Sequence, residues 1–197
     1  RLKSMIETRP DWCVSRQRVW GVPLPIFIKK NTGEILVDDE VFDNIAKIYE
    51  KEGSDCWFSD DPQKFLGKKY KAEDFEKLSD IVEVWFDSGS THSFVLEKRK
   101  DLKWPASMYL EGSDQHRGWF HSSLLESCGT RDRAPFESIL SHGFVVDGKG
   151  LKMSKSLGNV IAPEDILKKY GADILRIWVA SSNYAEDLRI DYSILDQ

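Results

Sequence analysis

Cysteine is scarce in this sequence, and its spacing excludes two kinds of site. The three cysteines, Cys13, Cys56 and Cys128, are far apart and form no Cys-x-x-Cys pair. A disulfide framework or a zinc knuckle needs paired or closely spaced cysteines. We therefore expect reduced thiols and a cytoplasmic protein.

Long apolar runs and an excess of basic charge are also missing. No apolar run approaches the roughly 20 residues that cross a bilayer, so no membrane partner is expected. The formal net charge is −5, from 28 basic and 33 acidic residues, which argues against a module that coats nucleic acid. The sequence also lacks a Gly-x-Ser-x-Gly elbow, so nothing supports a hydrolase triad. A 41% hydrophobic content with 31% charged residues is typical of a folded protein with a real core.

In the second half of the sequence, strand and helix patterns alternate. Apolar segments at 107–110 and 138–146 predict strands. Helices are expected over 115–128, 163–170 and 172–182. This alternation predicts an α/β fold with parallel strands and crossover helices, in which ligands bind beyond the carboxyl ends of the strands.

The first half is less regular. Segments 26–29 and 34–37 flank an Asn-Thr-Gly turn and predict a hairpin. An amphipathic helix follows, with apolar residues from Val41 to Tyr49 and an end near Gly53. Further along, the expected elements are a strand at 81–86, a turn at 87–90 and a helix at 91–100.

The string Lys152-Met153-Ser154-Lys155-Ser156 has glycines on both sides. Two ammonium groups on a glycine-flanked loop can close over a polyphosphate and offset the charge of a leaving pyrophosphate, so we expect a mobile cationic loop. The alternative is a solvated turn, which is the commoner structure for a short Lys/Ser/Gly stretch taken alone.

A second polar string, Glu111-Gly112-Ser113-Asp114-Gln115-His116, follows a predicted strand. Its carboxylates can accept from a ribose hydroxyl or a ligand ammonium, and its glycine lets a ligand approach the backbone. Helix capping by Ser113 or Asp114 is an equally good explanation. The cluster lacks recognisable metal-ligand spacing, so no metal site is predicted.

Several other side chains allow two interpretations each. Trp85 and Trp119 lie at the edges of polar turns, but large aromatic residues usually belong to the core. His142 lies within a predicted strand, where an interior histidine is commoner than a ligand contact. The polar residues at 16–18 either contact phosphates or pair with surface carboxylates.

Five strings in order resemble the class I aminoacyl-tRNA synthetases. Lys152–Ser156 is similar to their lysine signature, and four other strings resemble the catalytic half-domain of the isoleucyl enzymes in particular. Those four are Trp12–Pro23, Val84–Ser90, Tyr109–Phe120 and His142–Asp147. The resemblance is weakest over 30–80. The alternatives are a valyl or leucyl enzyme, and a non-catalytic nucleotide-binding module of the same fold.

The resemblance implies activation of isoleucine by ATP with Mg²⁺, followed by transfer to tRNA(Ile), in an enzyme that is monomeric at full length. It assigns catalytic roles to Lys152 and Lys155, with Lys155 on the ATP phosphates. It places His142 and Val145 along the adenine. The residues that it assigns to the adenylate or the amino-acid pocket are Glu111, Gly112, Asp114, Gln115, Trp85 and Trp119.

The family's other signature, His-x-Gly-His, is missing from this sequence. The chain also starts at Arg1 without methionine, and we expect it to be a piece of a longer protein with negligible activation activity alone. The resemblance implies three parts. Residues 1–29 begin a catalytic half-domain after an editing insertion, 30–80 form an inserted α+β connective subdomain, and 81–197 form the second half of a Rossmann-like fold with the lysine loop.

Overall fold

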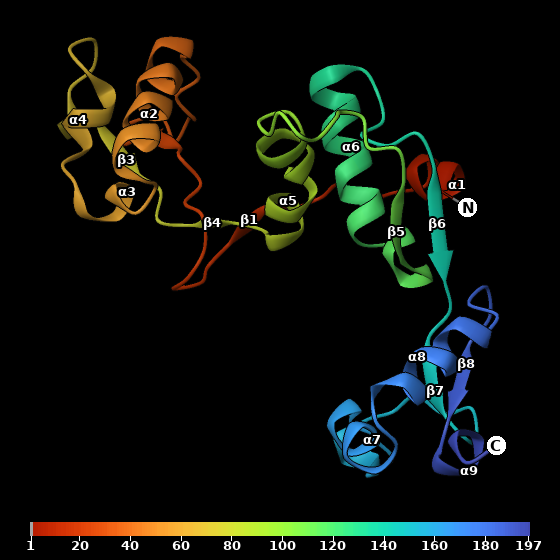
Figure 1. The fold of residues 1–197 in the computed structure, drawn as a ribbon. Coiled ribbons are helices and arrows are strands. Elements are labelled where there is room, and N and C mark those ends of the chain that lie inside the picture. The colour runs from red at the N-terminus through yellow and green to blue at the C-terminus, as the bar shows by residue number, and fades with distance from the viewer. Residues whose placement is uncertain (1) are drawn as a thin grey trace. The chain divides into compact units, whose positions relative to one another are not determined.

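The computed structural model describes residues 2–197, which divide into two compact units (Figure 1). One unit comprises Lys3–Thr91, and the other is built on His92–Gln197. Each unit is described by itself below. No helix in the described part of the chain is long and apolar enough to span a membrane.

The first unit combines short helices with two antiparallel strand pairs. Its strands are β1 (Ser15–Arg16), β2 (Phe27–Lys29), β3 (Phe75–Lys77) and β4 (Ile81–Val82), with β1 paired to β4 and β2 paired to β3. The helices up to residue 91 are α1 (Leu2–Glu7), α2 (Asp39–Glu52), α3 (Cys56–Ser59), α4 (Pro62–Leu66), the 3-10 turn η1 (Ala72–Asp74) and α5 (Val84–Gly89).

An aromatic core holds the region between β2 and β3 together. Trp57 and Phe65 are fully buried, and Phe27 packs on Trp57 with its ring centroid 5.1 Å away. The Trp57 indole Nε1–H donates to the Leu78 carbonyl at 2.7 Å, so its one polar group is satisfied. Such an aromatic cluster supplies the apolar burial that a region of this size needs to stay folded.

The predicted hairpin and the helix after it are both confirmed. Lys29 N–H donates to the Glu34 carbonyl, and Leu36 N–H donates to the Phe27 carbonyl, across the expected turn. The Asp38 carboxylate accepts from two backbone N–H groups at the start of α2, which then buries Val41 and Ile45. The helix ends at Gly53, where φ is 83°.

The second unit contains two parallel strand pairs with helical crossovers, as the α/β prediction requires. Strand β5 (Tyr109–Gly112) pairs with β6 (Ile139–His142), and α6 (Trp119–Arg131) connects them. Strand β7 (Val145–Asp147) pairs with β8 (Leu188–Ile190). Between them lie α7 (Pro163–Tyr170) and α8 (Ala172–Ser181), both close to their predicted bounds. The short elements are η2 (His92–Leu96), η3 (Ser113–His116), η4 (Lys155–Leu157) and α9 (Tyr192–Leu195).

The single strand predicted over 138–146 is wrong, because the chain changes partner at Gly143. Strand β6 ends at His142 and pairs with β5, whereas β7 begins at Val145 and pairs with β8. Between them, Gly143 N–H donates to the Tyr184 carbonyl at 2.9 Å. A Cβ at Gly143 would fall 2.3 Å from the Glu186 carbonyl oxygen, so the close approach requires glycine.

Three other predicted elements differ in the structure. Strand β4 stops at Val82 because the Glu83 carboxylate accepts from Trp85 N–H and starts α5, which absorbs most of the predicted turn at 87–90. The helix expected from 115 begins at Trp119, after the 3-10 turn η3. The helix expected over 91–100 is the short π-helical segment η2.

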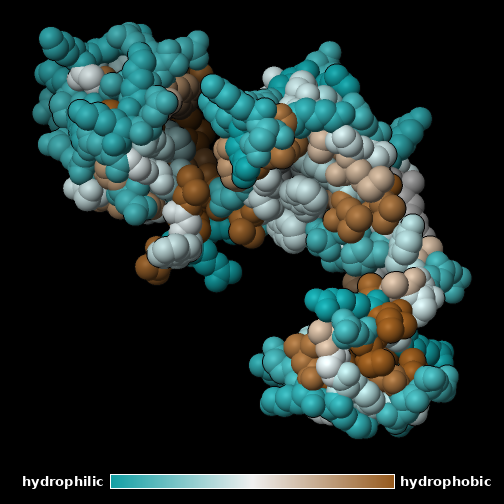
Figure 2. All heavy atoms as spheres, viewed as in Figure 1, coloured by the Kyte–Doolittle hydropathy of each residue, from teal (hydrophilic) through white to brown (hydrophobic). Residues whose placement is uncertain are grey.

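A small apolar cluster lies in the C-terminal part of the second unit. Ile166, Ile190 and Leu195 are buried together, and Met153 from the lysine string packs against them. Figure 2 shows apolar side chains reaching the surface over the same segment, where Leu157 and Ile177 are largely exposed. Leu110 of β5, expected in a buried strand, is likewise 57% exposed, so this sheet face is open.

Candidate functional site

A groove of about 590 Å³ lies at the carboxyl ends of β5 and β6. The pairing of these strands places Glu111 beside Ser141 and Gly112 beside His142. This is the edge at which parallel α/β sheets bind ligands. The lining combines polar groups with an apolar wall, and comprises Leu110, Glu111, Gly112, Asp114, Leu140, His142, Gly143, Phe144, Val145, Tyr184 and Leu188.

The polar side of the groove is built from Glu111, Asp114 and His142. Glu111 Oε1 accepts from Gly112 N–H at 2.9 Å and lies 3.9 Å from His142 Nε2. The His142 Nδ1 atom lies 2.8 Å from the Gly143 carbonyl oxygen, which fixes the ring plane. Both Glu111 and His142 side chains are partly exposed, so their contact is weak and leaves both groups accessible to a ligand.

Gly112 is the point where the backbone comes closest to these side chains. A Cβ there would lie 2.6 Å from Asp114 Oδ1 and 3.7 Å from His142 Cε1. Any larger residue would displace the Asp114 carboxylate from the groove. The structure therefore brings together five of the predicted residues: Glu111, Gly112, Asp114, His142 and Val145.

Gln115 and Trp119 are engaged in local structure instead. Gln115 Oε1 accepts from Trp119 N–H at 2.9 Å and so caps the first turn of α6. Helix capping, the alternative considered for Ser113 or Asp114, is made by Gln115 instead. The Trp119 ring stacks on Tyr109, with centroids 4.1 Å apart and planes 5° from parallel. Neither Gln115 nor Trp119 lines the groove.

Trp85 belongs to the other unit, where it lies on α5 and is 42% exposed. That unit has a cavity of its own, of about 800 Å³, lined by Arg16, Arg18, Trp20, Glu83 and Asp87 among others. Burial raises the pKa of the Asp87 carboxyl, and the neighbouring Glu83 carboxylate adds to the effect.

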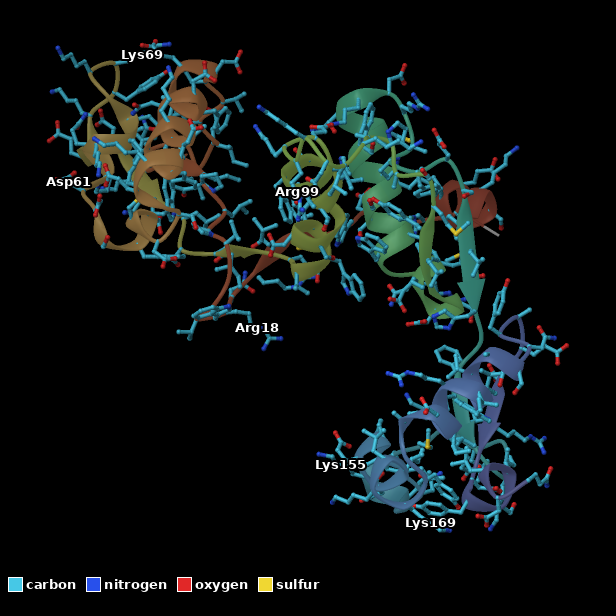
Figure 3. The ribbon with its side chains drawn as sticks, viewed as in Figure 1. Arg18, Asp61, Lys69, Arg99, Lys155 and Lys169 are labelled. Atoms are coloured by element: carbon cyan, nitrogen blue, oxygen red, sulfur yellow. The ribbon has the colours of Figure 1, made fainter. Side chains whose placement is uncertain are left out.

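The polar residues at 16–18 follow neither interpretation completely. Arg16 donates to the Cys13 and Ser15 carbonyls rather than to a carboxylate. Gln17 Nε2 donates to Asp80 Oδ2 at 2.8 Å. Arg18 extends away from the ribbon at the loop tip (Figure 3).

The lysine string forms an ordered turn in this structure. Val146 and Lys152 form an antiparallel bridge, and Ser154 Oγ accepts from Leu157 N–H to cap η4, which Lys155 begins. Gly158 ends this turn at a φ of 64°. Lys152 and Lys155 are both exposed, and among the described residues neither has an ion-pair partner. Lys155 is labelled in Figure 3.

One group of metal-ligating side chains occurs among the described residues. Ligand atoms of Glu52, Cys56 and Asp60 lie within 4.8 Å of one another. The Lys64 ammonium lies 2.6 Å from a Glu52 oxygen and 2.7 Å from an Asp60 oxygen. Lys64 thus balances the two carboxylates, and a cation would have to displace it.

Sequence patterns missed several residues that build this region. Phe144, Tyr184 and Leu188 form much of the apolar wall of the groove. The alternating Leu188-Arg189-Ile190 segment is a strand signal that could have identified β8. Sequence patterns also did not identify Asp147 and Asn159, whose side chains hydrogen-bond to each other and to the backbone around the lysine turn.

Comparisons with known proteins identify a family and several similar proteins. The family model described as "tRNA synthetases class I (I, L, M and V)" matches residues 1–191. The isoleucine–tRNA ligase of Pelagibacter ubique (strain HTCC1062) is 88% identical over all 197 residues. The enzymes of the same name from Caldicellulosiruptor saccharolyticus and Brucella abortus biovar 1 are 57% and 59% identical, over 100% and 99% of this chain.

The chain spans about a fifth of the length of these relatives: 22%, 22% and 20% respectively. A solved structure has the same fold, with a TM-score of 0.65 and 23% identity. It is the Agrobacterium radiobacter K84 LeuRS in a ternary complex described as LeuRS-tRNA-LeuAMS, and the match covers 94% of this chain and 26% of that one. The family match extends over nearly the whole chain, and the chain therefore belongs to the class I tRNA synthetases of the I, L, M and V group.

Proposed function

We propose that the chain forms part of the catalytic domain of an isoleucine–tRNA ligase. The carrying observation is the 88% identity to such an enzyme over every residue of the chain, together with a polar and apolar groove at the carboxyl ends of parallel strands. In the proposed reaction the isoleucine carboxylate attacks the α-phosphorus of ATP, and pyrophosphate leaves. A hydroxyl of the terminal ribose of tRNA(Ile) then attacks the acyl carbon of the adenylate, and AMP leaves.

The groove is suited to hold the adenylate. The Glu111 and Asp114 carboxylates are acceptors for an ammonium group and for ribose hydroxyls, and Gly112 leaves room for them. His142 ends β6 and Val145 begins β7, and both line the same groove as the apolar wall, which suits an adenine ring. Trp119 stacks on Tyr109, which favours a supporting role for that ring beside the isoleucine side chain. The role of Trp85 in the amino-acid pocket stays a prediction from the resemblance.

The lysine turn carries the proposed phosphate contact. Lys152 and Lys155 present exposed ammonium groups, which stabilise the charge that develops as pyrophosphate leaves. Mg²⁺ enters with ATP as part of the substrate and is held mainly by phosphate oxygens. Such a reaction depends on positioning and charge stabilisation more than on covalent participation of the protein.

The test uses the full-length protein and isoleucine-dependent exchange of pyrophosphate into ATP. Lys155→Ala should reduce exchange by at least about a hundredfold, because a group that stabilises charge only in the transition state is lost. Lys168→Ala, which removes an exposed lysine of α7, should leave exchange unchanged. Wild-type exchange with Lys155→Ala would refute the phosphate role.

Amino-acid specificity distinguishes the proposed isoleucyl enzyme from the alternatives, which are a valyl or leucyl enzyme and a non-catalytic nucleotide-binding module. Exchange should be supported best by isoleucine, and less by valine or leucine. Preference for either of those would favour a valyl or leucyl enzyme, and no exchange at all would favour a nucleotide-binding module. We also propose that the 197-residue chain alone has negligible exchange activity, because it contains no His-x-Gly-His string. We further propose that the full-length enzyme is monomeric and cytoplasmic.

A further inference from the structure

Asp147 lies at the end of β7, where the lysine turn begins, and it organises the first arm of that turn. Its Oδ1 atom accepts from Lys149 N–H at 2.9 Å and from Leu151 N–H at 2.8 Å. Its own N–H donates to the Leu151 carbonyl, and its carbonyl accepts from Gly150 N–H. Four bonds therefore close residues 147–151 into a compact loop.

Asn159 lies at the other end of the turn and uses both ends of its amide. Nδ2 donates to Asp147 Oδ2 at 2.8 Å and to the Lys152 carbonyl at 3.2 Å. Oδ1 accepts from Ser154 N–H at 2.9 Å. One side chain thus contacts the entry of the turn and two backbone groups inside it.

The two backbone groups that Asn159 binds belong to Lys152 and to the residue directly before Lys155. The first is the carbonyl of Lys152 itself. The second is the N–H of Ser154, whose hydroxyl caps the short helix that Lys155 begins. The side chains of Lys152 and Lys155 are exposed, while Asn159 binds the backbone at Lys152 and Ser154. The pair of Asp147 and Asn159 is called the clasp from here on.

We propose that the clasp is a positioning element for the phosphate-binding lysines: it holds the turn in the conformation that presents Lys152 and Lys155 to ATP. This inference rests on the proposed function. A surface contact of general stabilising value would need only one hydrogen bond to the loop. The clasp has five side-chain hydrogen bonds: four join it to four different loop residues, and the fifth joins Asn159 to Asp147.

The Asp147 carboxylate is well suited to this role. The Asn159 amide and the backbone N–H of Leu151 hold its pKa below the ordinary value. Asp147 therefore remains an ionised acceptor at neutral pH, and bonds to an ionised acceptor are the stronger kind.

The first experiment uses Asn159→Ala and Asp147→Asn in the full-length protein, with isoleucine-dependent pyrophosphate exchange and hydrogen exchange of the backbone amides at 149–154. We expect kcat/KM for ATP to fall about tenfold or more, which corresponds to the loss of one or two charge-assisted bonds. KM for isoleucine should change less than about twofold. The loop amides should exchange faster, while those of α7 and α8 should not.

Two matched controls carry the same chemical changes elsewhere. Asp173→Asn removes an exposed carboxylate at the start of α8, and Asn31→Ala removes an exposed amide in the hairpin turn of the other unit. Both should behave as wild type in every measurement. A fall in melting temperature with unchanged ATP kinetics in Asn159→Ala would overturn the positioning role.

A swap of the two side chains tests the pairing itself. Asn159→Asp alone places two carboxylates face to face and should be more damaging than Asn159→Ala. Adding Asp147→Asn restores one amide opposite one carboxylate and should recover part of the lost kcat/KM for ATP. No recovery would overturn the pairing.

The two proposals fail in different ways. A wild-type protein without isoleucine-dependent exchange would refute the proposed function, and the hydrogen-exchange data would still test the clasp. Loop amides that exchange equally fast in wild type and Asn159→Ala would overturn the clasp whatever the activity.

Discussion

Trp119 stacks flat on Tyr109, with ring centroids 4.1 Å apart and planes 5° from parallel. Tyr109 begins β5 and is 4% exposed, and its hydroxyl lies 3.0 Å from Ser123 Oγ on α6. The stack and this hydrogen bond join the strand to the crossover helix. They hold the helix start against the strand whose far end carries Glu111 and Gly112.

Replacing Trp119 should therefore destabilise the second unit. Trp119→Ala is expected to lower the free energy of unfolding by about 2 to 4 kcal/mol, because a large buried ring face and its stacking partner are lost. Urea denaturation followed by circular dichroism measures this. Trp20→Ala is the control, since Trp20 is 91% exposed and a surface change should stay within about 0.5 kcal/mol. Equal effects of the two changes would contradict the structural role of the stack.

Gly112→Ala should impair the groove with little effect on folding. Its new Cβ would meet Asp114 Oδ1 at 2.6 Å and push the carboxylate aside. In full-length protein we expect kcat/KM for pyrophosphate exchange to fall at least about tenfold, because misplacing a binding group is costly to catalysis. Gly129→Ala on α6 has open space around it and should keep full activity while gaining about 0.5 to 1 kcal/mol of stability.

Gly143→Ala should be more damaging than Gly112→Ala to stability. The added Cβ would lie 2.3 Å from the Glu186 carbonyl oxygen and 2.7 Å from Asp187 N, so backbone has to move. The expected loss is about 1 to 3 kcal/mol, from overpacking at a site that cannot relax through a side chain. Thermal melting of this variant beside Gly129→Ala measures it. A melting temperature equal to that of wild type would show that the close approach is absent in solution.

Asp38 should make the first unit sensitive to acid. Hydrogen bonds from the Lys69 ammonium and the Tyr70 hydroxyl lower the pKa of its carboxyl from 3.8 to about 2. A lowered folded-state pKa contributes stability that is fully present above the unfolded value and is lost as the pH falls through the folded value. We therefore expect the contribution of Asp38 to disappear between about pH 4 and pH 2.

Asp38→Asn tests this effect, because asparagine keeps the Oδ1 atom that caps α2 and replaces the Oδ2 atom that accepts from Lys69 and Tyr70 with an uncharged amide donor. The variant should melt below wild type at pH 7 and approach it near pH 2. Asp39→Asn, at an exposed position that has no ion-pair partner in the described part of the chain, should follow the wild-type profile. A wild-type profile for Asp38→Asn would exclude the ion pair as a source of stability.

Local sequence patterns were sufficient to predict helix ends where a single proline or glycine determines the backbone conformation. Pro163 and Gly171 mark the ends of α7, and both of its predicted bounds are confirmed. The same holds for the helix that ends at Gly53. Each of these signals acts within a few residues of the boundary that it sets.

Features that depend on distant partners were not predictable in this way. The run from Ile139 to Val146 has apolar residues at both ends, and only the approach of residues 184–187 reveals why the strand breaks at Gly143. In the groove, Glu111 and His142 could be proposed from a family resemblance. Tyr184, in the turn before β8, and Leu188, at the start of β8, lie more than 40 residues beyond His142. The Asp147–Asn159 bond spans 12 residues of loop and leaves no periodic signal.

Met153 lies between the two motif lysines and packs on the buried cluster of Ile166, Ile190 and Leu195. A thioether side chain can slide and repack within an apolar cluster more readily than a branched one. Met153 therefore attaches the turn to the apolar cluster through an adaptable contact. We expect a branched side chain at this position to restrict the turn and a smaller one to loosen it.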